Sequence, residues 1–161
     1  MGLFFTVLSI SFLLLVSIAF IYLIQRRPVF KSRFKHPFKS LPDERVRQRL
    51  ARRVTRVLDL WDIDEADQLE LLGIPAKKQS LLVAYRQGQA LDTERDQLGR
   101  VGHILAIHQG LKSLGPNDRS RRFYWVKETN SKLGGLRPLD LMLEGYEGLL
   151  TVREYVDFVK G

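Results

Sequence analysis

The residues best suited to chemistry in this chain are three histidines, His36, His103 and His108, because the chain contains no cysteine. The lack of cysteine excludes a thiolate zinc site, an iron–sulfur cluster, a disulfide scaffold and a cysteine nucleophile. His103 and His108 are five residues apart, about 140° around a helix, so they do not face one metal ion. We expect His108 to be packed in the core and His103 to lie at the surface.

Two further patterns could carry chemistry, the Gly134-Gly135 pair before Pro138 and the carboxylates Glu144 and Glu147. No Gly-x-Gly-x-x-Gly or Gly-Lys-Ser/Thr motif accompanies the glycine pair, so it predicts a tight turn rather than a phosphate cradle. The two carboxylates are expected to be exposed, and no serine stands in a nucleophile-elbow context. The sequence therefore predicts an interaction module, with no enzyme activity, metal or cofactor.

The N-terminal residues 1–24 contain no charged residue, and 19 of these 24 positions are apolar. A helix over residues 2–24 would be about 34 Å long, enough to cross a hydrocarbon core of about 30 Å. A cleaved signal peptide is the alternative, but no basic residue precedes the apolar run and no small-residue cleavage site follows it. We therefore predict an uncleaved transmembrane anchor.

Residues 25–42 form a basic linker punctuated by prolines. Six of the 26 Lys and Arg residues lie within residues 25–39, so residues 40–161 have a formal net charge of only +2. These cations predict a single-pass inner-membrane protein whose C-terminal side is cytoplasmic. They also predict contact with anionic headgroups. The expected headgroup-binding residues are Arg26, Arg27, Lys31, Arg33 and Lys35.

The remaining residues predict an all-α fold. Asp43 can cap a helix whose apolar residues repeat at spacings of three and four up to Trp61, with arginines on its other faces. Two short helices, 65–72 and 76–86, flank a turn at Gly73 and have the helix-turn-helix shape. The sequence therefore predicts an anchor over residues 1–24, a linker over residues 25–42 and, over residues 43–91, a helical region that contains the helix-turn-helix unit.

The C-terminal domain is expected over residues 92–161. Its longest helix runs from Asp92 to about Leu114, and Gly99, Gly102 and Gly110 could let a neighbouring helix come close. Shorter helices are predicted at 122–128, 138–143 and 148–159, and no segment predicts a strand.

Several C-terminal motifs resemble the antitoxins of the Xre/MbcA/ParS family. The most specific are Trp125-Val126, Asn130, Leu133-Gly134-Gly135, Pro138-Leu139-Asp140-Leu141 and Val152-Arg153-Glu154-Tyr155-Val156. The likeness covers about residues 60–161. It implies an all-helical, dimeric antitoxin whose partner is a RES-domain toxin, a small enzyme that depletes NAD.

In this family the last helix and tail block the active site of the toxin. By position, the resemblance assigns toxin binding to Val152, Arg153, Tyr155, Val156, Lys160 and Gly161. It assigns the scaffold of that surface to Trp125, Leu133, Gly134, Gly135, Pro138 and Leu139. The alternative for the apolar members is that their side chains belong to the core.

The helix-turn-helix unit departs from the family pattern. Leu81, Val83 and Ala84 cannot hydrogen-bond base edges, which argues against sequence-specific DNA binding. The residues that could still contact DNA phosphates are Lys77, Lys78 and Arg86. The sequence thus favours a membrane-anchored antitoxin. Two alternatives stay open, a membrane-tethered helix-turn-helix DNA-binding regulator and a structural adaptor without a toxin.

Overall fold

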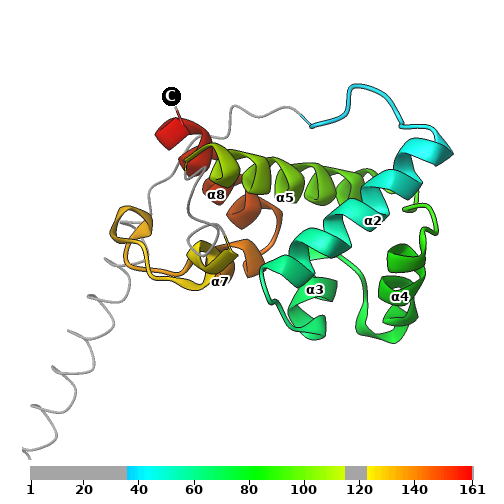
Figure 1. Cartoon of the computed structure of the whole chain (residues 1–161), viewed down its shortest axis with the longest axis horizontal. Coiled ribbons are helices and arrows are strands. Elements are labelled where there is room, and N and C mark those ends of the chain that lie inside the picture. The colour runs from blue at the N-terminus through cyan, green and yellow to red at the C-terminus, as the bar shows by residue number, and fades with distance from the viewer. Residues whose placement is uncertain (1–35, 115–122, 161) are drawn as a thin grey trace, which may run out of the picture.

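The computed structural model describes residues 36–114 and 123–160, which fold into helices joined by short turns (Figure 1). In chain order the elements are α2 (Glu44–Leu60), α3 (Glu65–Leu72), the 3-10 turn η1 (Ala76–Lys78), α4 (Ser80–Gln87), α5 (Arg95–Leu114), η2 (Trp125–Lys127), η3 (Ser131–Leu133), α7 (Pro138–Leu143) and α8 (Tyr146–Lys160). The described residues contain no strand, only an isolated bridge between Asn130 and Leu136. The predicted all-α class is confirmed for this part of the chain.

The predicted membrane anchor falls on residues that the structure does not describe, and so do the five predicted headgroup-binding cations, Arg26, Arg27, Lys31, Arg33 and Lys35. None of the described helices combines the length and the hydropathy needed to cross a bilayer. The anchor therefore stays a prediction from sequence.

Local signals set the ends of the first helices as expected. The carboxylates of Asp43 and Asp64 each accept a hydrogen bond from the backbone N–H three residues later, at 2.8 Å in α2 and 2.9 Å in α3. These bonds satisfy N–H groups that have no partner within the helix. Helices α3 and α4 end at Gly73 and Gly88, whose φ values of 65° and 103° suit glycine.

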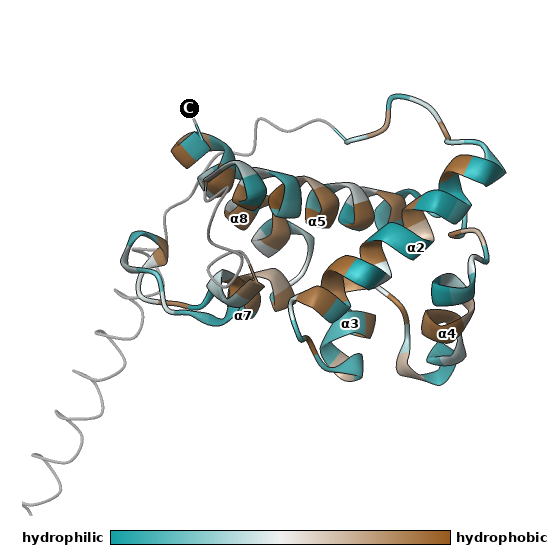
Figure 2. Cartoon of the chain, viewed as in Figure 1, coloured by the Kyte–Doolittle hydropathy of each residue, from teal (hydrophilic) through white to brown (hydrophobic). Residues whose placement is uncertain are grey.

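The core forms around α5. Helices α2 and α8 both pack against α5, α4 packs on α2, and α7 contacts α3 and α8 (Figure 1). Hydrophobic and hydrophilic residues alternate along α2 and α8, as they do on amphipathic helices (Figure 2). Trp61 and Tyr85 are the largest of the fully buried side chains. Removing this apolar surface from water is the main force that holds the helices together.

Glycines on α5 allow close packing, as the sequence predicts. A Cβ on Gly99 would crowd the Tyr146 ring, and a Cβ on Gly110 would overlap Val156. Because Gly99 meets the start of α8 and Gly110 meets its later part, the two helices run parallel. Gly102 differs from the expectation, since its neighbour is Pro37 of the linker rather than a helix.

Some sequence expectations need correction. His103, expected at the surface, is only 3% exposed, because Tyr146 of α8 covers that side of α5. His108 is buried, as predicted. The helix expected over residues 76–86 is divided into η1 and α4, and the one expected at 122–128 is mostly the 3-10 turn η2. The end of the linker packs on α5, where a His36 nitrogen (Nε2) hydrogen-bonds the Arg95 carbonyl oxygen at 2.8 Å.

Candidate functional site

The Leu133-Gly134-Gly135 motif forms a tight turn ahead of α7. Gly134 and Gly135 have φ values of 71° and 79°, in the left-handed region that favours glycine. Asn130 closes the turn, because its backbone N–H donates to the Leu136 carbonyl oxygen at 3.0 Å. The predicted turn is therefore confirmed. Both glycines are exposed, whereas Leu133 is buried beneath them.

The scaffold residues on α7 anchor this turn to the core. Pro138 is the first residue of α7, where its missing N–H has no helical partner to lose, and both Pro138 and Leu139 are buried. The guanidinium of Arg137 pairs with Asp140 through two contacts, the longer being 2.8 Å from Nε to Oδ2. These hydrogen bonds lower the pKa of Asp140. The start of α7 is thereby fixed on both its buried and its exposed side.

Helix α8 divides the six predicted toxin-binding residues between core and surface. Val152 and Val156 are fully buried, so their side chains pack in the core. Arg153 and Tyr155 are half-buried, and Lys160 is exposed. Gly161 lies outside the described residues. Of the two interpretations of Val152 and Val156, the placement favours a core role.

The C-terminal end of α8 carries exposed apolar side chains that the sequence analysis did not single out. Phe158 is 79% exposed and Val159 is 45% exposed. Both lie beside Tyr155 at helical spacings of three and four. The Tyr155 ring stacks on Trp125, with centroids 6.0 Å apart and an interplanar angle of 8°. We call Trp125, Tyr155, Phe158 and Val159 the terminal apolar patch.

The spacing of residues in the sequence could have indicated that Phe158 is exposed. The buried positions of α8, including Leu149, Val152 and Val156, repeat every three or four residues. Phe158 falls about 180° from Leu149 around the helix, so it cannot join that buried side. A large aromatic residue at this position is therefore expected on the outer side of the helix.

A charged pair lies beside the terminal apolar patch. Arg153 Nε donates to Asp157 Oδ2 at 2.6 Å, one turn along α8. At the interface between α5 and α8, His103 Nε2 and the Tyr146 hydroxyl are hydrogen-bonded at 3.0 Å. Burial lowers the pKa of His103 to about 4, and the nearby positive charge of Arg153 acts in the same direction. His103 is therefore neutral at neutral pH and serves as a packing residue of the α5–α8 interface.

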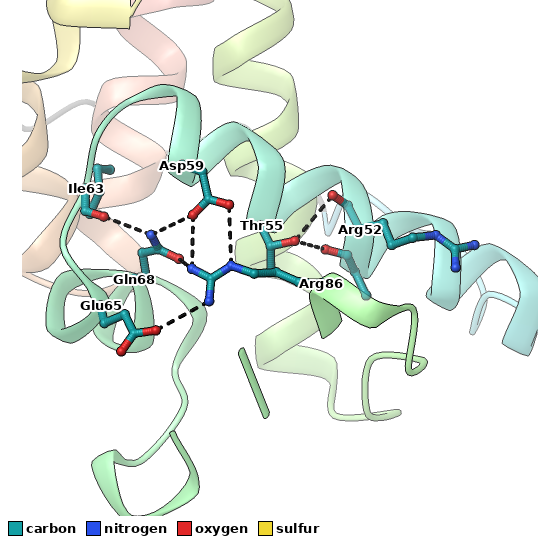
Figure 3. A network of polar contacts seen from close by, with 8 residues as sticks. Arg52, Thr55, Asp59, Ile63, Glu65, Gln68 and Arg86 are labelled. Atoms are coloured by element: carbon teal, nitrogen blue, oxygen red, sulfur yellow. Dashed lines mark hydrogen bonds and ion pairs between the residues drawn. The ribbon is translucent and has the colours of Figure 1, made fainter. Parts of the chain in front are cut away.

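The helix-turn-helix-like region holds its predicted phosphate-binding residues in different situations. Lys77 and Lys78 are exposed. Arg86 instead points back toward α2 and α3, where it contacts Asp59 at 3.0 Å and Glu65 at 3.4 Å (Figure 3). Hydrogen bonding to Asp59 raises the pKa of Arg86. The guanidinium of Arg86 thus joins three helices to one another.

Among the described residues, no group of three or more His, Cys, Asp or Glu side chains could hold a metal ion. The most exposed large apolar side chain of the described residues is Phe158, at the end of α8. Residues 111–161 match the family model of the antitoxin Xre/MbcA/ParS C-terminal toxin-binding domain.

A relative covers more of the chain. The uncharacterized protein y4oB of Sinorhizobium fredii (strain NBRC 101917 / NGR234) is 31% identical over 107 residues, which are 66% of this chain and 80% of that protein. The chain therefore belongs to the same family as y4oB, and its C-terminal part is similar to antitoxin toxin-binding domains. All twelve predicted toxin-binding and scaffold residues, and the whole terminal apolar patch, lie within the matched residues 111–161.

Proposed function

We propose that this protein is an antitoxin that binds and neutralises a RES-domain, NAD-depleting toxin by covering its active site. The observation that carries the proposal is the match of residues 111–161 to a toxin-binding domain. The terminal apolar patch supports it, because its members Phe158 and Val159 are solvent-exposed within the matched range. In this proposal Arg153, Tyr155, Lys160 and Gly161 contact the toxin, while Val152 and Val156 hold α8 in place from the core.

The terminal apolar patch has the composition of a protein–protein contact. Aromatic residues and arginine supply much of the binding energy in such interfaces. Phe158 is exposed and so is free to enter a pocket of the partner, and it lies three residues after Tyr155, whose ring stacks on Trp125. Arg153 already holds a carboxylate, that of Asp157, so an acidic group of the toxin would compete for the same guanidinium.

The test is binding to, and protection from, a co-expressed RES-domain toxin, taken from beside this gene if one is encoded there. We expect the full chain to restore growth of toxin-expressing cells and to co-purify with the toxin. The double variant Phe158→Ser, Val159→Ser should weaken the complex by about tenfold or more, because it removes the exposed apolar side chains of the contact. Isothermal titration calorimetry measures that loss.

Val83→Ser is the matched control, since Val83 is 49% exposed on α4, far along the chain from α8. It should leave the affinity unchanged. Circular dichroism should show that all variants stay folded, because none of these side chains is buried. The proposal is wrong if the toxin forms no complex, or if the double variant binds and protects as well as the natural chain.

We also propose that residues 2–24 anchor the protein in the inner membrane with the helical domain in the cytoplasm. The uncharged apolar run and the basic residues after it support this orientation. The chain should resist extraction by alkaline carbonate, and a phosphatase fused to its C-terminus should be inactive. Extraction into the supernatant would contradict the anchor. Light scattering of the detergent-solubilised chain, alone and with toxin, tests the dimer implied by the resemblance.

A further inference from the structure

Helix α2 carries an unusual concentration of positive charge on its outer side. Five arginines, Arg45, Arg49, Arg52, Arg53 and Arg56, are exposed, and the guanidinium of Arg52 also lies against Gly88 at the end of α4. At about 100° per residue they fall within an arc of about 100°, opposite the buried residues Val54 and Leu58. They extend along about 16 Å of the helix. We call these five residues the arginine stripe.

The guanidinium groups of the arginine stripe have no ion-pair partner in the described part of the chain. None of its guanidinium groups takes part in a hydrogen bond or ion pair there, whereas Arg47, on the inner side of α2, donates to the Leu91 carbonyl oxygen at 2.6 Å. Around the axis of α2, Asp59 is the acidic residue closest to the arginine stripe. Its carboxylate is already paired with Arg86 (Figure 3). Adjacent like charges repel one another, so this arrangement lowers helix stability unless an anion covers it.

The path of the chain limits where the arginine stripe can lie. His36 is hydrogen-bonded to α5 through the Arg95 carbonyl oxygen, and Pro37 packs over Gly102, so the chain is attached to the domain from residue 36 onward. If residues 2–24 span the membrane, only the eleven residues 25–35 separate its surface from this attachment. Even fully extended, they reach about 40 Å. The domain is thus confined close to the headgroups.

From these observations we propose that the arginine stripe is a second membrane-contacting surface, which lays α2 along anionic lipid headgroups. The inference rests on the proposed anchor. A row of guanidinium groups matches a planar array of phosphates, and the adjoining basic linker continues the same charge. The stripe has no aromatic side chain with which to stack nucleic-acid bases, which favours lipid over single-stranded nucleic acid.

The absence of cysteine allows a site-specific test in the full-length chain. Gln48→Cys places a fluorophore between Arg45 and Arg52 on α2, and Lys132→Cys places one on the exposed turn η3. Each labelled protein is reconstituted in phosphatidylcholine vesicles, with or without about one quarter phosphatidylglycerol, that carry a headgroup quencher. We expect anionic lipid to raise quenching at position 48 about twofold or more, with little change at position 132. Salt should reverse the effect.

The matched comparison is between two triple substitutions that remove equal charge. Arg45→Gln, Arg49→Gln, Arg56→Gln should at least halve the lipid-dependent quenching, whereas Lys77→Gln, Lys78→Gln, Lys112→Gln should not. Equal effects of the two variants, or equal quenching at position 48 in neutral and anionic vesicles, would overturn the stripe proposal. So would stripe-dependent binding of a DNA duplex without any lipid effect.

Flotation separates this proposal from that of the anchor. If the full chain floats with neutral vesicles, the anchor is supported and quenching decides the role of the stripe. If it fails to float with neutral vesicles, the anchor proposal is wrong. The stripe is then supported only if the chain floats with anionic vesicles and the triple arginine variant does not.

Discussion

At the scale of single residues, His103 shows how a polar side chain can be accommodated in the core. It is hydrogen-bonded to Tyr146 across the α5–α8 interface, and the two rings meet edge to face with centroids 5.4 Å apart. The Arg100 guanidinium lies over the Tyr146 ring, 5.9 Å from its centroid. A neutral imidazole satisfies this site, but a charged one would lose its hydration.

The pH dependence of stability should reveal this burial. The pKa of His103 is about 4 in the folded chain, below the usual 6.5, so the unfolded chain binds more protons between these values. Stability is therefore fully present above pH 6.5 and falls as the pH drops toward 4. Between pH 7 and pH 5 we expect the free energy of unfolding to fall by about 2 kcal/mol from this group. Urea titrations at both pH values measure it.

The control is His103→Gln, which cannot titrate. Its own stability should change by about 2 kcal/mol less over the same interval, since all other titrating groups are retained. An identical pH dependence in the two proteins would show that His103 is accessible to protons in the folded state.

Gly148 is the second residue at which a single substitution should change the stability of the chain clearly. It lies in α8, and a Cβ there would overlap the backbone carbonyl of Leu141 in α7. Alanine normally stabilises a helix interior relative to glycine by up to about 1 kcal/mol. Here we expect Gly148→Ala to destabilise the chain by about 2–3 kcal/mol, because backbone cannot move aside as a side chain can. Thermal unfolding measures the loss, and Glu147→Ala, at an exposed neighbour, should be nearly neutral.

At the scale of elements, the parallel packing of α5 and α8 determines which side of α8 reaches solvent. Gly110 admits Val156, and Gly99 admits Tyr146, so the two helices approach closely at two points. This contact draws one side of α8 into the core. The terminal apolar patch is consequently left on the outside, at the end of the helix.

A double-mutant cycle tests the close approach at Gly110. Gly110→Ala should cost about 1–3 kcal/mol through overlap with Val156, and Val156→Ala should cost a similar amount through the cavity it leaves. Together they should cost less than their sum by about 1 kcal/mol, since the shortened side chain makes room for the new methyl group. Chemical denaturation gives all three values. Gly110→Ala combined with the distant Leu82→Ala should be additive, and additivity in both pairs would contradict the contact.

At the scale of the whole molecule, the residues that match the family model are not the same as the residues that share one core. The match begins at residue 111, in the last turn of α5. The buried side of α8 packs on the length of α5 before that residue, and α7 also contacts α3. The toxin-binding part therefore relies on residues outside the matched range for its core.

This dependence predicts the behaviour of fragments. Residues 36–161 should unfold in one cooperative transition, because α2, α5 and α8 share one core. Residues 111–161 alone should be largely unfolded, since they lack the part of α5 that covers Leu149 and Val152. Circular dichroism at increasing urea distinguishes the two. A cooperative transition in the shorter fragment would show that it is an independent domain.

The sequence by itself determined most of the local structure of the described residues. Asp43, Asp64, Gly73 and Gly88 mark helix ends because capping depends on residues only a few positions apart. The three- and four-residue spacing of apolar side chains likewise identified the helices. It did not predict that residues 76–86 divide into the 3-10 turn η1 and the α-helix α4, because the same residues are compatible with both kinds of helix.

Only the tertiary structure decided which side chains remain available to a partner. Val152 and Val156 resemble surface-forming residues by motif, yet α5 buries them. His103 looks exposed by its spacing from His108, yet Tyr146 covers it, and Arg86 is bound by acids from two other helices. Burial and ion pairing depend on elements distant in sequence, and the spacing within one helix contains no information about which neighbour will cover it.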